Sequence, residues 1–271
     1  MTKCRMRTSV ALTVGVLTLA ATAAAQTTPA QAPPRDPHAA QPERPTVATH
    51  AGTVAPGWFE LETGTEFDTY PDKTFGASSP TLLKIGVGKR LQLSVQTPLV
   101  QPAGTTHTGF GDLAVGMKWR VLEDAPILGD FAILPSIKLP TGSVDTGDGT
   151  GTTDAGFLLI SSHQFGPVAM DLNAGVTFRS GDGSNAPKTA TVWTASFGGP
   201  AAGKLGWCAE LFGFPATSGP AGSDSVVAVL AGPTFTAREW IVFDAGVIMK
   251  LTGDQPTAFY AGLTWNIGGI K

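Results

Sequence analysis

The stretch from Gly109 to Val121 is the feature that most constrains how this 271-residue chain can fold. From Asp112 onward, charged or small residues alternate with large apolar ones, among them Met117 and Trp119. A period of two is that of a β-strand, in which successive side chains point to opposite faces. Two environments produce such sorting: a soluble sandwich with its apolar face inside, or a membrane barrel with its apolar face in lipid.

Composition narrows the class of protein further. Only 14% of the residues are charged, whereas an average soluble domain has roughly 25%. The 34 glycines and 21 prolines argue against a helical bundle. A net charge of -3 without a basic stripe argues against a nucleic-acid partner. Cys4 and Cys208 offer at most one disulfide, and none if the N-terminus is removed.

The N-terminus has the pattern of a secretory signal. Basic residues precede an apolar run at residues 10–21, and three alanines follow at 23–25. The run is shorter than the roughly 18 residues that a membrane-spanning helix needs. The sequence therefore predicts a signal peptide at residues 1–25, cleaved after Ala25, and export from the cytoplasm.

Residues 26–56 are rich in Pro, Thr and Ala and show no periodicity. This composition predicts a disordered periplasmic linker. Its two histidines, His38 and His50, are expected to be solvated rather than bound to a metal. The sequence does not decide whether this linker enters the barrel as a plug.

Residues 57–268 contain twelve alternating runs of about nine to twelve residues, near the 9 to 11 that cross a bilayer at a tilt. Short turns alternate with longer loops rich in Gly, Pro, Asp and Ser, as in outer-membrane barrels, whereas a sandwich needs no such order. The sequence therefore predicts an all-β fold, a 12-stranded antiparallel up-and-down transmembrane β-barrel. A soluble secreted sandwich is the alternative.

The polar face of the predicted strands must avoid lipid, because a charge there costs on the order of 2 to 4 kcal/mol at the midplane. We expect these charges to line the lumen, as a possible solute path: Glu60, Glu62, Lys84, Asp112, Lys118, Arg120, Lys138, Asp171, Arg179, Glu210, Asp244 and Lys250. Tryptophans near strand ends are expected to form an aromatic girdle at the membrane interface. They are Trp58, Trp119, Trp193, Trp207, Trp240 and Trp265.

Three motifs, at residues 109–120, 134–142 and 262–267, resemble those of the phenol meta-pathway (MetA-type) degradation family of outer-membrane β-barrel proteins. The resemblance covers roughly Trp58 to Ile267. It implies location in the outer membrane of a Gram-negative bacterium, in contact with lipid and with the assembly machinery. It also implies a transporter associated with aromatic catabolism. The chain departs from the usual pattern of outer-membrane proteins at its C-terminus, where residues 268–271 replace a terminal aromatic residue.

These observations favour a passive channel for small solutes, including aromatic or hydrophobic compounds, that needs no cofactor or metal. Small lumenal residues such as Gly116 argue for open space. The alternative is a structural barrel whose lumen is filled by ion pairs, since the strand number leaves this open. The oligomeric state is not indicated.

Two other readings have weaker support. Ser161, Ser162 and His163 could belong to an outer-membrane lipid hydrolase, but neighbouring strand residues face opposite ways, so only Ser161 and His163 share a face. The loop at residues 145–154 carries three aspartates, yet its spacing does not match a calcium-binding EF-hand.

Overall fold

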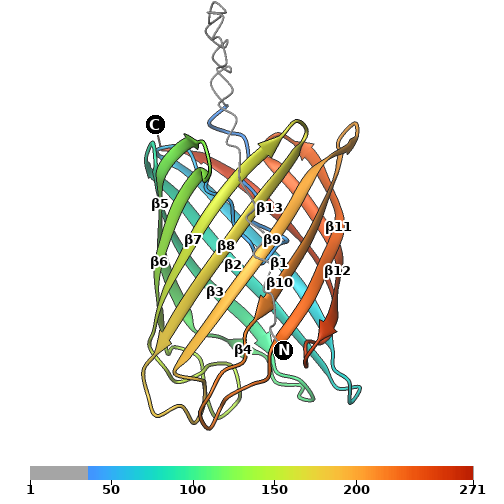
Figure 1. Cartoon of the computed structure of the whole chain (residues 1–271). Coiled ribbons are helices and arrows are strands. Elements are labelled where there is room, and N and C mark those ends of the chain that lie inside the picture. Colours follow the sequence, from blue (N-terminus) through green and yellow to red (C-terminus); the bar gives the residue numbers. More distant parts are fainter. Residues whose placement is uncertain (1–35, 271) are drawn as a thin grey trace, which may run out of the picture. The chain divides into compact units, whose positions relative to one another are not determined.

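The computed structural model describes residues 36–270, which form one sheet of tilted strands closed on itself (Figure 1). In chain order the strands are β1 (Trp58–Thr69), β2 (Phe75–Gly88), β3 (Leu91–Gln101), β4 (Gly109–Phe110), β5 (Leu113–Ala125), β6 (Gly129–Leu139), β7 (Asp154–Phe165), β8 (Val168–Arg179), β9 (Thr189–Ala202), β10 (Leu205–Phe214), β11 (Val226–Arg238), β12 (Ile241–Thr252) and β13 (Thr257–Gly269). Within residues 36–270, no helix is long and apolar enough to cross a membrane.

The sheet closes because β1 pairs with β2 on one side and with β13 on the other, and all the pairings between strands are antiparallel. The two-residue β4 pairs with β3 just before β5 does, so the two count as one wall strand. The predicted 12-stranded antiparallel barrel is thus confirmed. The strand expected from Gly109 is interrupted at Gly111 and Asp112, where the Asp112 carboxylate receives hydrogen bonds from the loop between β6 and β7.

The distribution of apolar side chains is the reverse of that in a soluble protein. On β13, Phe259 and Ile267 are 64% and 46% exposed on the outside, whereas Tyr260 and Asn266 are 5% and 0% exposed on the inside. Water-soluble proteins bury large apolar side chains and rarely expose wide apolar patches. A continuous outer band of this kind is stable where lipid covers it.

The connections fall into two classes at opposite ends of the barrel. At one end, which we call the short-turn rim, β2–β3, β7–β8, β9–β10 and β11–β12 are joined through residues 89–90, 166–167, 203–204 and 239–240. Gly166 and Gly203 have positive φ angles of 58° each, a conformation that glycine adopts without strain. The other end, the long-loop rim, carries residues 102–108, 140–153, 180–188 and 215–225. The predicted alternation of short and long connections is therefore present.

Residues 36–56, which we call the lumen segment, lie inside this barrel (the blue trace in Figure 1). The segment begins at the short-turn rim, where the Ala40 amide donates to the Glu239 carbonyl (2.8 Å). It reaches Gly64 and Gly262 in the middle of the wall and returns to the same rim, where Pro56 pairs with Gly86.

The expected disordered linker is therefore wrong for residues 36–56. Composition favoured disorder because the segment has few apolar residues, but the barrel wall supplies polar partners that the segment alone lacks. The predicted signal peptide at residues 1–25 and the first part of the linker lie outside the described residues.

Candidate functional site in the barrel lumen

Wall carboxylates bind the backbone of the lumen segment directly. The Gln41 amide donates to Glu60 Oε2 (2.6 Å), while the Glu43 and Arg44 amides donate to the two oxygens of Glu62 (2.8 and 3.1 Å). Both glutamates lie on β1 and are buried. A carboxylate that accepts two successive amides is held in one orientation, so β1 fixes the descending half of the segment.

The opposite wall binds the next part of the segment in the same way. Glu210 on β10 accepts hydrogen bonds from the Val47 and Ala48 amides (2.8 and 2.7 Å). On β8, the Asn173 side chain accepts from the Thr49 amide (2.8 Å) and donates to the Thr49 carbonyl (2.9 Å). The segment is therefore held between β1 on one side and β8 and β10 on the other.

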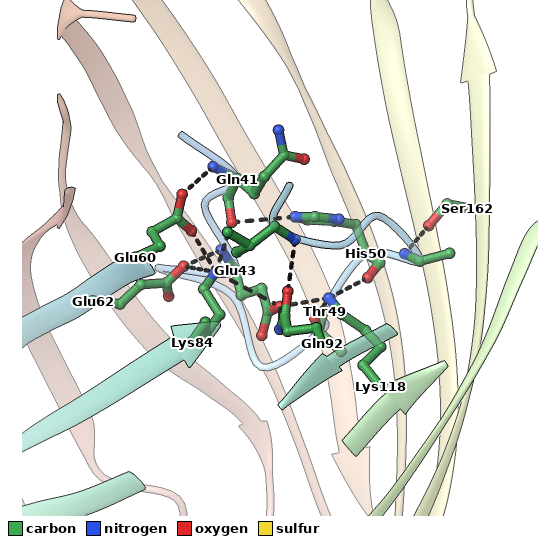
Figure 2. A network of polar contacts seen from close by, with 12 residues as sticks. Gln41, Glu43, Thr49, His50, Glu60, Glu62, Lys84, Gln92, Lys118 and Ser162 are labelled. Atoms are coloured by element: carbon green, nitrogen blue, oxygen red, sulfur yellow. Dashed lines mark hydrogen bonds and ion pairs between the residues drawn. The ribbon is translucent and has the colours of Figure 1, made fainter. Parts of the chain in front are cut away.

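Two buried lysines organise the charged part of the site (Figure 2). Lys84, 0% exposed, lies 2.6 Å from both Glu60 and Glu62 and donates to the Gln41 carbonyl (2.8 Å). Lys118, 1% exposed, lies 2.5 Å from Glu43 and donates to the His50 carbonyl (2.9 Å). Each lysine thus joins the lumen segment to the wall, and Glu43 lies between them.

A second ion pair holds the deepest point of the segment. Arg44 Nη2 lies 3.1 Å from Asp244 Oδ1 on β12. The guanidinium fits against the wall because Gly64 and Gly262 lack side chains: a Cβ at either position would lie 2.5 Å from Arg44. Some of the small residues that seemed to indicate open space are therefore places where the segment approaches the wall closely.

Burial shapes the titration of the segment's own groups. Burial alone would raise the pKa of Glu43, but the attraction of Lys118 and Lys84 holds that pKa below its usual value. Burial, reinforced by Lys118, lowers the pKa of His50 to about 3. Glu43 is accordingly charged and His50 neutral near neutral pH, which matches the cationic site that they share.

The lumen segment divides the short-turn end of the barrel into two cavities, which we call the vestibules. One, of about 810 Å³, is polar and is lined by His50, Arg120 and Asp171 among others. The other, of about 820 Å³, lies against β9 to β12 and is lined by Thr234 and Val242 among others. Both vestibules share Ala39 and Pro42, so the segment forms the partition between them.

A separate polar network lies at the long-loop rim. Asp112 accepts hydrogen bonds from Lys138 Nζ (2.6 Å) and from the amides of Gly142 and Thr150 (both 3.0 Å). Lys138 also contacts Asp154 (3.4 Å). These contacts tie the loop at residues 140–153 to Asp112 and to Lys138 on β6.

Part of the lumen is apolar, although the alternation predicts a polar inner face. A buried cluster lies on β10 to β13 and comprises Cys208, Phe212, Ala228, Leu230, Ile248, Ala258 and Tyr260. Within residues 36–270, Cys208 is a free thiol that donates to the Gly232 carbonyl (3.4 Å). The lumen therefore has a charged side on β1 to β5, whereas on β10 to β13 an apolar cluster lies on the same strands as the buried carboxylates Glu210 and Asp244.

The remaining predicted lumenal charges lie toward the rims. Asp171 accepts from Ser162 (2.5 Å) next to the polar vestibule, and Arg120 pairs with Glu123 (2.8 Å) at the short-turn rim. Arg179 binds Asp154 (3.1 Å) at the long-loop end, whereas Lys250 is exposed there. The lumen segment thus contacts only some of the predicted charges: Glu60, Glu62, Lys84, Lys118, Glu210 and Asp244.

The predicted aromatic girdle divides into two groups. Four tryptophans have exposed rings on the outside of the wall: Trp119, Trp193, Trp207 and Trp265. Trp58 and Trp240 instead contact the lumen segment, since their rings lie 5.0 and 5.5 Å from the ring of His38. His38 also reaches the Asn266 carbonyl (3.1 Å), so these aromatic rings hold the start of the segment at the rim.

The two weaker sequence motifs form structural contacts. Ser161 Oγ lies 2.9 Å from His163 Nε2, but it donates its proton to the Leu128 carbonyl (2.8 Å), which leaves no activated nucleophile at this pair. In the acidic loop, Asp148 binds His107 (2.8 Å) while Asp154 binds Arg179. The two carboxylates therefore point to different partners and do not converge on one cation.

Sequence reasoning missed the half of the site that lies in residues 36–56. In the segment, the Glu43 and Arg44 side chains pair with Lys118 and Asp244, while His50 contributes its backbone carbonyl, which accepts a hydrogen bond from Lys118. Wall residues Asn173 and Gln92 were also missed, since uncharged amides did not stand out on the polar face. A signal was present in the charged pair Glu43-Arg44 within an otherwise small-residue stretch.

Comparison with solved structures shows that this barrel has a fold found in outer-membrane proteins. The COG4313 outer membrane channel from Pseudomonas putida F1 superposes with a TM-score of 0.62 over 79% of this chain and 97% of that one, at 11% identity. The KdgM porin shares the fold with a TM-score of 0.54 over 77% of this chain and 99% of that one, at 11% identity. The NanC porin does so with a TM-score of 0.52 over 77% of this chain and 100% of that one, at 8% identity.

At these identities the structures show a common fold, and no curated protein sequence matches the chain. A family model, in contrast, matches residues 43–267, which include the charged core of the lumen segment and all of the barrel wall except the last two residues of β13. The resemblance expected from the three sequence motifs is confirmed. The chain belongs to the family described as "Putative MetA-pathway of phenol degradation".

Proposed function

We propose that this protein is an outer-membrane channel for small solutes, and that the lumen segment must move before solutes can pass. The observation that carries the proposal is that residues 36–56 bind to opposite walls of the same barrel, through Glu62 on β1 and Glu210 on β10. Backbone that crosses a lumen in this way closes it. The vestibules on either side of the segment provide the space into which a moving segment can shift.

The two sides of the lumen suggest the chemistry of the solute. A molecule that passes between the charged side and the apolar cluster meets Lys84 and Lys118 on one side, and Phe212 and Tyr260 on the other. An aromatic or hydrophobic solute with one polar group matches both surfaces. The family description, which names phenol degradation, supports this class. A KdgM porin structure in complex with disordered oligogalacturonate supports solute entry into barrels of this fold.

A reversible latch tests the proposal. Ala51 is buried, and its amide lies 2.8 Å from Ser162 Oγ, so we choose these two positions for a pair of cysteines between segment and wall. The variant Ala51→Cys/Ser162→Cys is made in a Cys208→Ser background, which removes the native thiol. We expect few conducting events in planar bilayers under oxidising conditions and more events after reduction. Each single-cysteine variant is the matched control and should not respond to the reductant.

A barrel lacking residues 36–56 distinguishes a channel from a filled structural barrel. If this variant inserts, runs as a folded heat-modifiable species and still carries no current, the channel proposal is wrong. If it conducts, aromatic carboxylates added to one side should block the current at lower concentrations than aliphatic carboxylates of equal charge. Cleavage after Ala25 is a separate part of the proposal, tested by N-terminal sequencing of the protein purified from outer membranes.

A further inference from the structure

The contacts of the lumen segment are unusual because the wall recognises its main chain more than its side chains. Eight amides of residues 41–54 donate to wall side chains: those of Gln41, Glu43, Arg44, Val47, Ala48, Thr49, Ala51 and Val54. The acceptors lie on five strands and are Glu60, Glu62, Gln92, Ser162, Asn173 and Glu210. Elsewhere in the described barrel, backbone amides are satisfied mainly by neighbouring strands.

Carbonyl groups of the segment are also bound. Lys84 donates to the Gln41 carbonyl (2.8 Å), Lys118 to that of His50 (2.9 Å), and Asn173 to that of Thr49 (2.9 Å). Asn173 therefore binds both the amide and the carbonyl of a single residue, as a neighbouring β-strand would. A wall that offers acceptors and donors at these spacings has the chemistry of a peptide receptor.

The shape of the wall is adapted to the same backbone. A Cβ on Gly86 would lie 2.2 Å from the Ala55 carbonyl oxygen, so only glycine allows the segment to leave along β2. Ala48 and Ala51 are fully or almost fully buried, and Ala51 packs against Ala132 and Ile160. Small side chains at these positions let the backbone approach the wall to hydrogen-bond distance.

We propose that the lumen is a peptide-binding site, and that residues 36–56 are a separable ligand for it. The ligand class is a short peptide with small side chains around one anchoring pair, equivalent to Glu43 and Arg44, which bind Lys118 and Asp244. The segment therefore stays bound when its covalent link to β1 is cut, and a free peptide of the same sequence replaces it. This inference concerns binding and does not depend on whether solutes pass through the barrel.

Cutting the folded protein tests the inference. A protease recognition sequence is inserted between Pro56 and Gly57, where the chain is exposed at the short-turn rim. After folding in detergent micelles and cleavage, the N-terminal fragment should co-elute with the barrel on size-exclusion chromatography and separate from it only in denaturant. A fluorescent peptide of residues 36–56 should then exchange into the complex, as followed by anisotropy.

Matched variants show whether the main-chain contacts carry the binding. Glu210→Gln keeps the shape of the side chain but replaces one of two acceptors by a donor, so the peptide should exchange about tenfold faster. A scrambled peptide with the same composition should not bind. Glu123→Gln, at the exposed end of β5 away from the segment, should behave as the unmodified barrel.

Two results would overturn the inference. One is complete loss of the fragment immediately after cleavage, and the other is equal binding of the native and scrambled peptides. If the inserted sequence resists the protease, the barrel lacking residues 36–56 is refolded and titrated with the fluorescent peptide. Saturable binding of the native sequence alone supports the proposal, and no binding to a folded barrel refutes it.

Discussion

Replacing Glu43 by glutamine is the most direct way to weaken the closed state. The Glu43 carboxylate lies 2.5 Å from Lys118 and 3.7 Å from Lys84. Lys84 keeps Glu60 and Glu62 after the change, but Lys118 is left with neutral oxygens only. Breaking a fully buried ion pair costs about 3 to 5 kcal/mol.

We expect a smaller loss of free energy than this range because water reaches the site. The Glu43 side chain is 15% exposed, so water can partly solvate Lys118 once the carboxylate is lost. We therefore expect a loss of about 2 kcal/mol in the docking of the lumen segment. This corresponds to a rise of roughly thirty-fold in the ratio of open to closed protein.

Single-channel recording measures this ratio directly, and Glu123→Gln provides the control. Glu123 pairs with Arg90 and Arg120 at 2.7 and 2.8 Å but is more than a third exposed, so its loss should change the ratio by about twofold at most. Adding Lys118→Met to Glu43→Gln removes the unpaired charge and should restore part of the closed population. If Glu43→Gln and Glu123→Gln have the same effect, the ion pair does not hold the segment.

Three further predictions follow. Docking of the segment lowers the pKa of His50 to about 3 from an ordinary 6.5, so docking weakens as pH falls below 6.5. The ratio of open to closed protein should therefore rise by up to about thirty-fold near pH 5. His50→Gln should remove this part of the pH response in conductance. A barrel without residues 36–56 should be cation-selective, as measured by the reversal potential in a salt gradient. The reason is that four wall carboxylates (Glu60, Glu62, Glu210 and Asp244) then face only two lysines, Lys84 and Lys118. Anion selectivity would contradict the structure. Asp112→Ala should release the loop at residues 140–153. Amide hydrogen exchange should become faster at Gly142 and Thr150 and stay unchanged in β8. Protection equal to that of the native protein would show that Asp112 does not anchor the loop.

The barrel wall could be read from sequence because its signal is local. Each strand has to place lipid-facing and lumen-facing residues in alternation, so a run such as 257–267 carries its own evidence of both faces. The connection lengths add the second constraint, which distinguishes a barrel from a sandwich. The apolar cluster around Phe212 was harder to predict, because a residue inside a barrel is polar only where water or a charged partner meets it.

What lies in the lumen was decided by tertiary structure alone. Residues 36–56 have the composition of a disordered linker, and no local pattern shows that Glu43 will lie beside Lys118, 75 positions later, or Arg44 beside Asp244, 200 positions later. The sequence by itself determined a closed membrane barrel with charges inside, because strand alternation needs only neighbouring residues. Those charges could line an open path or hold a peptide, and the choice depends on groups that meet only after β1 and β13 have closed the wall. The structure places residues 36–56 among the lumenal charges.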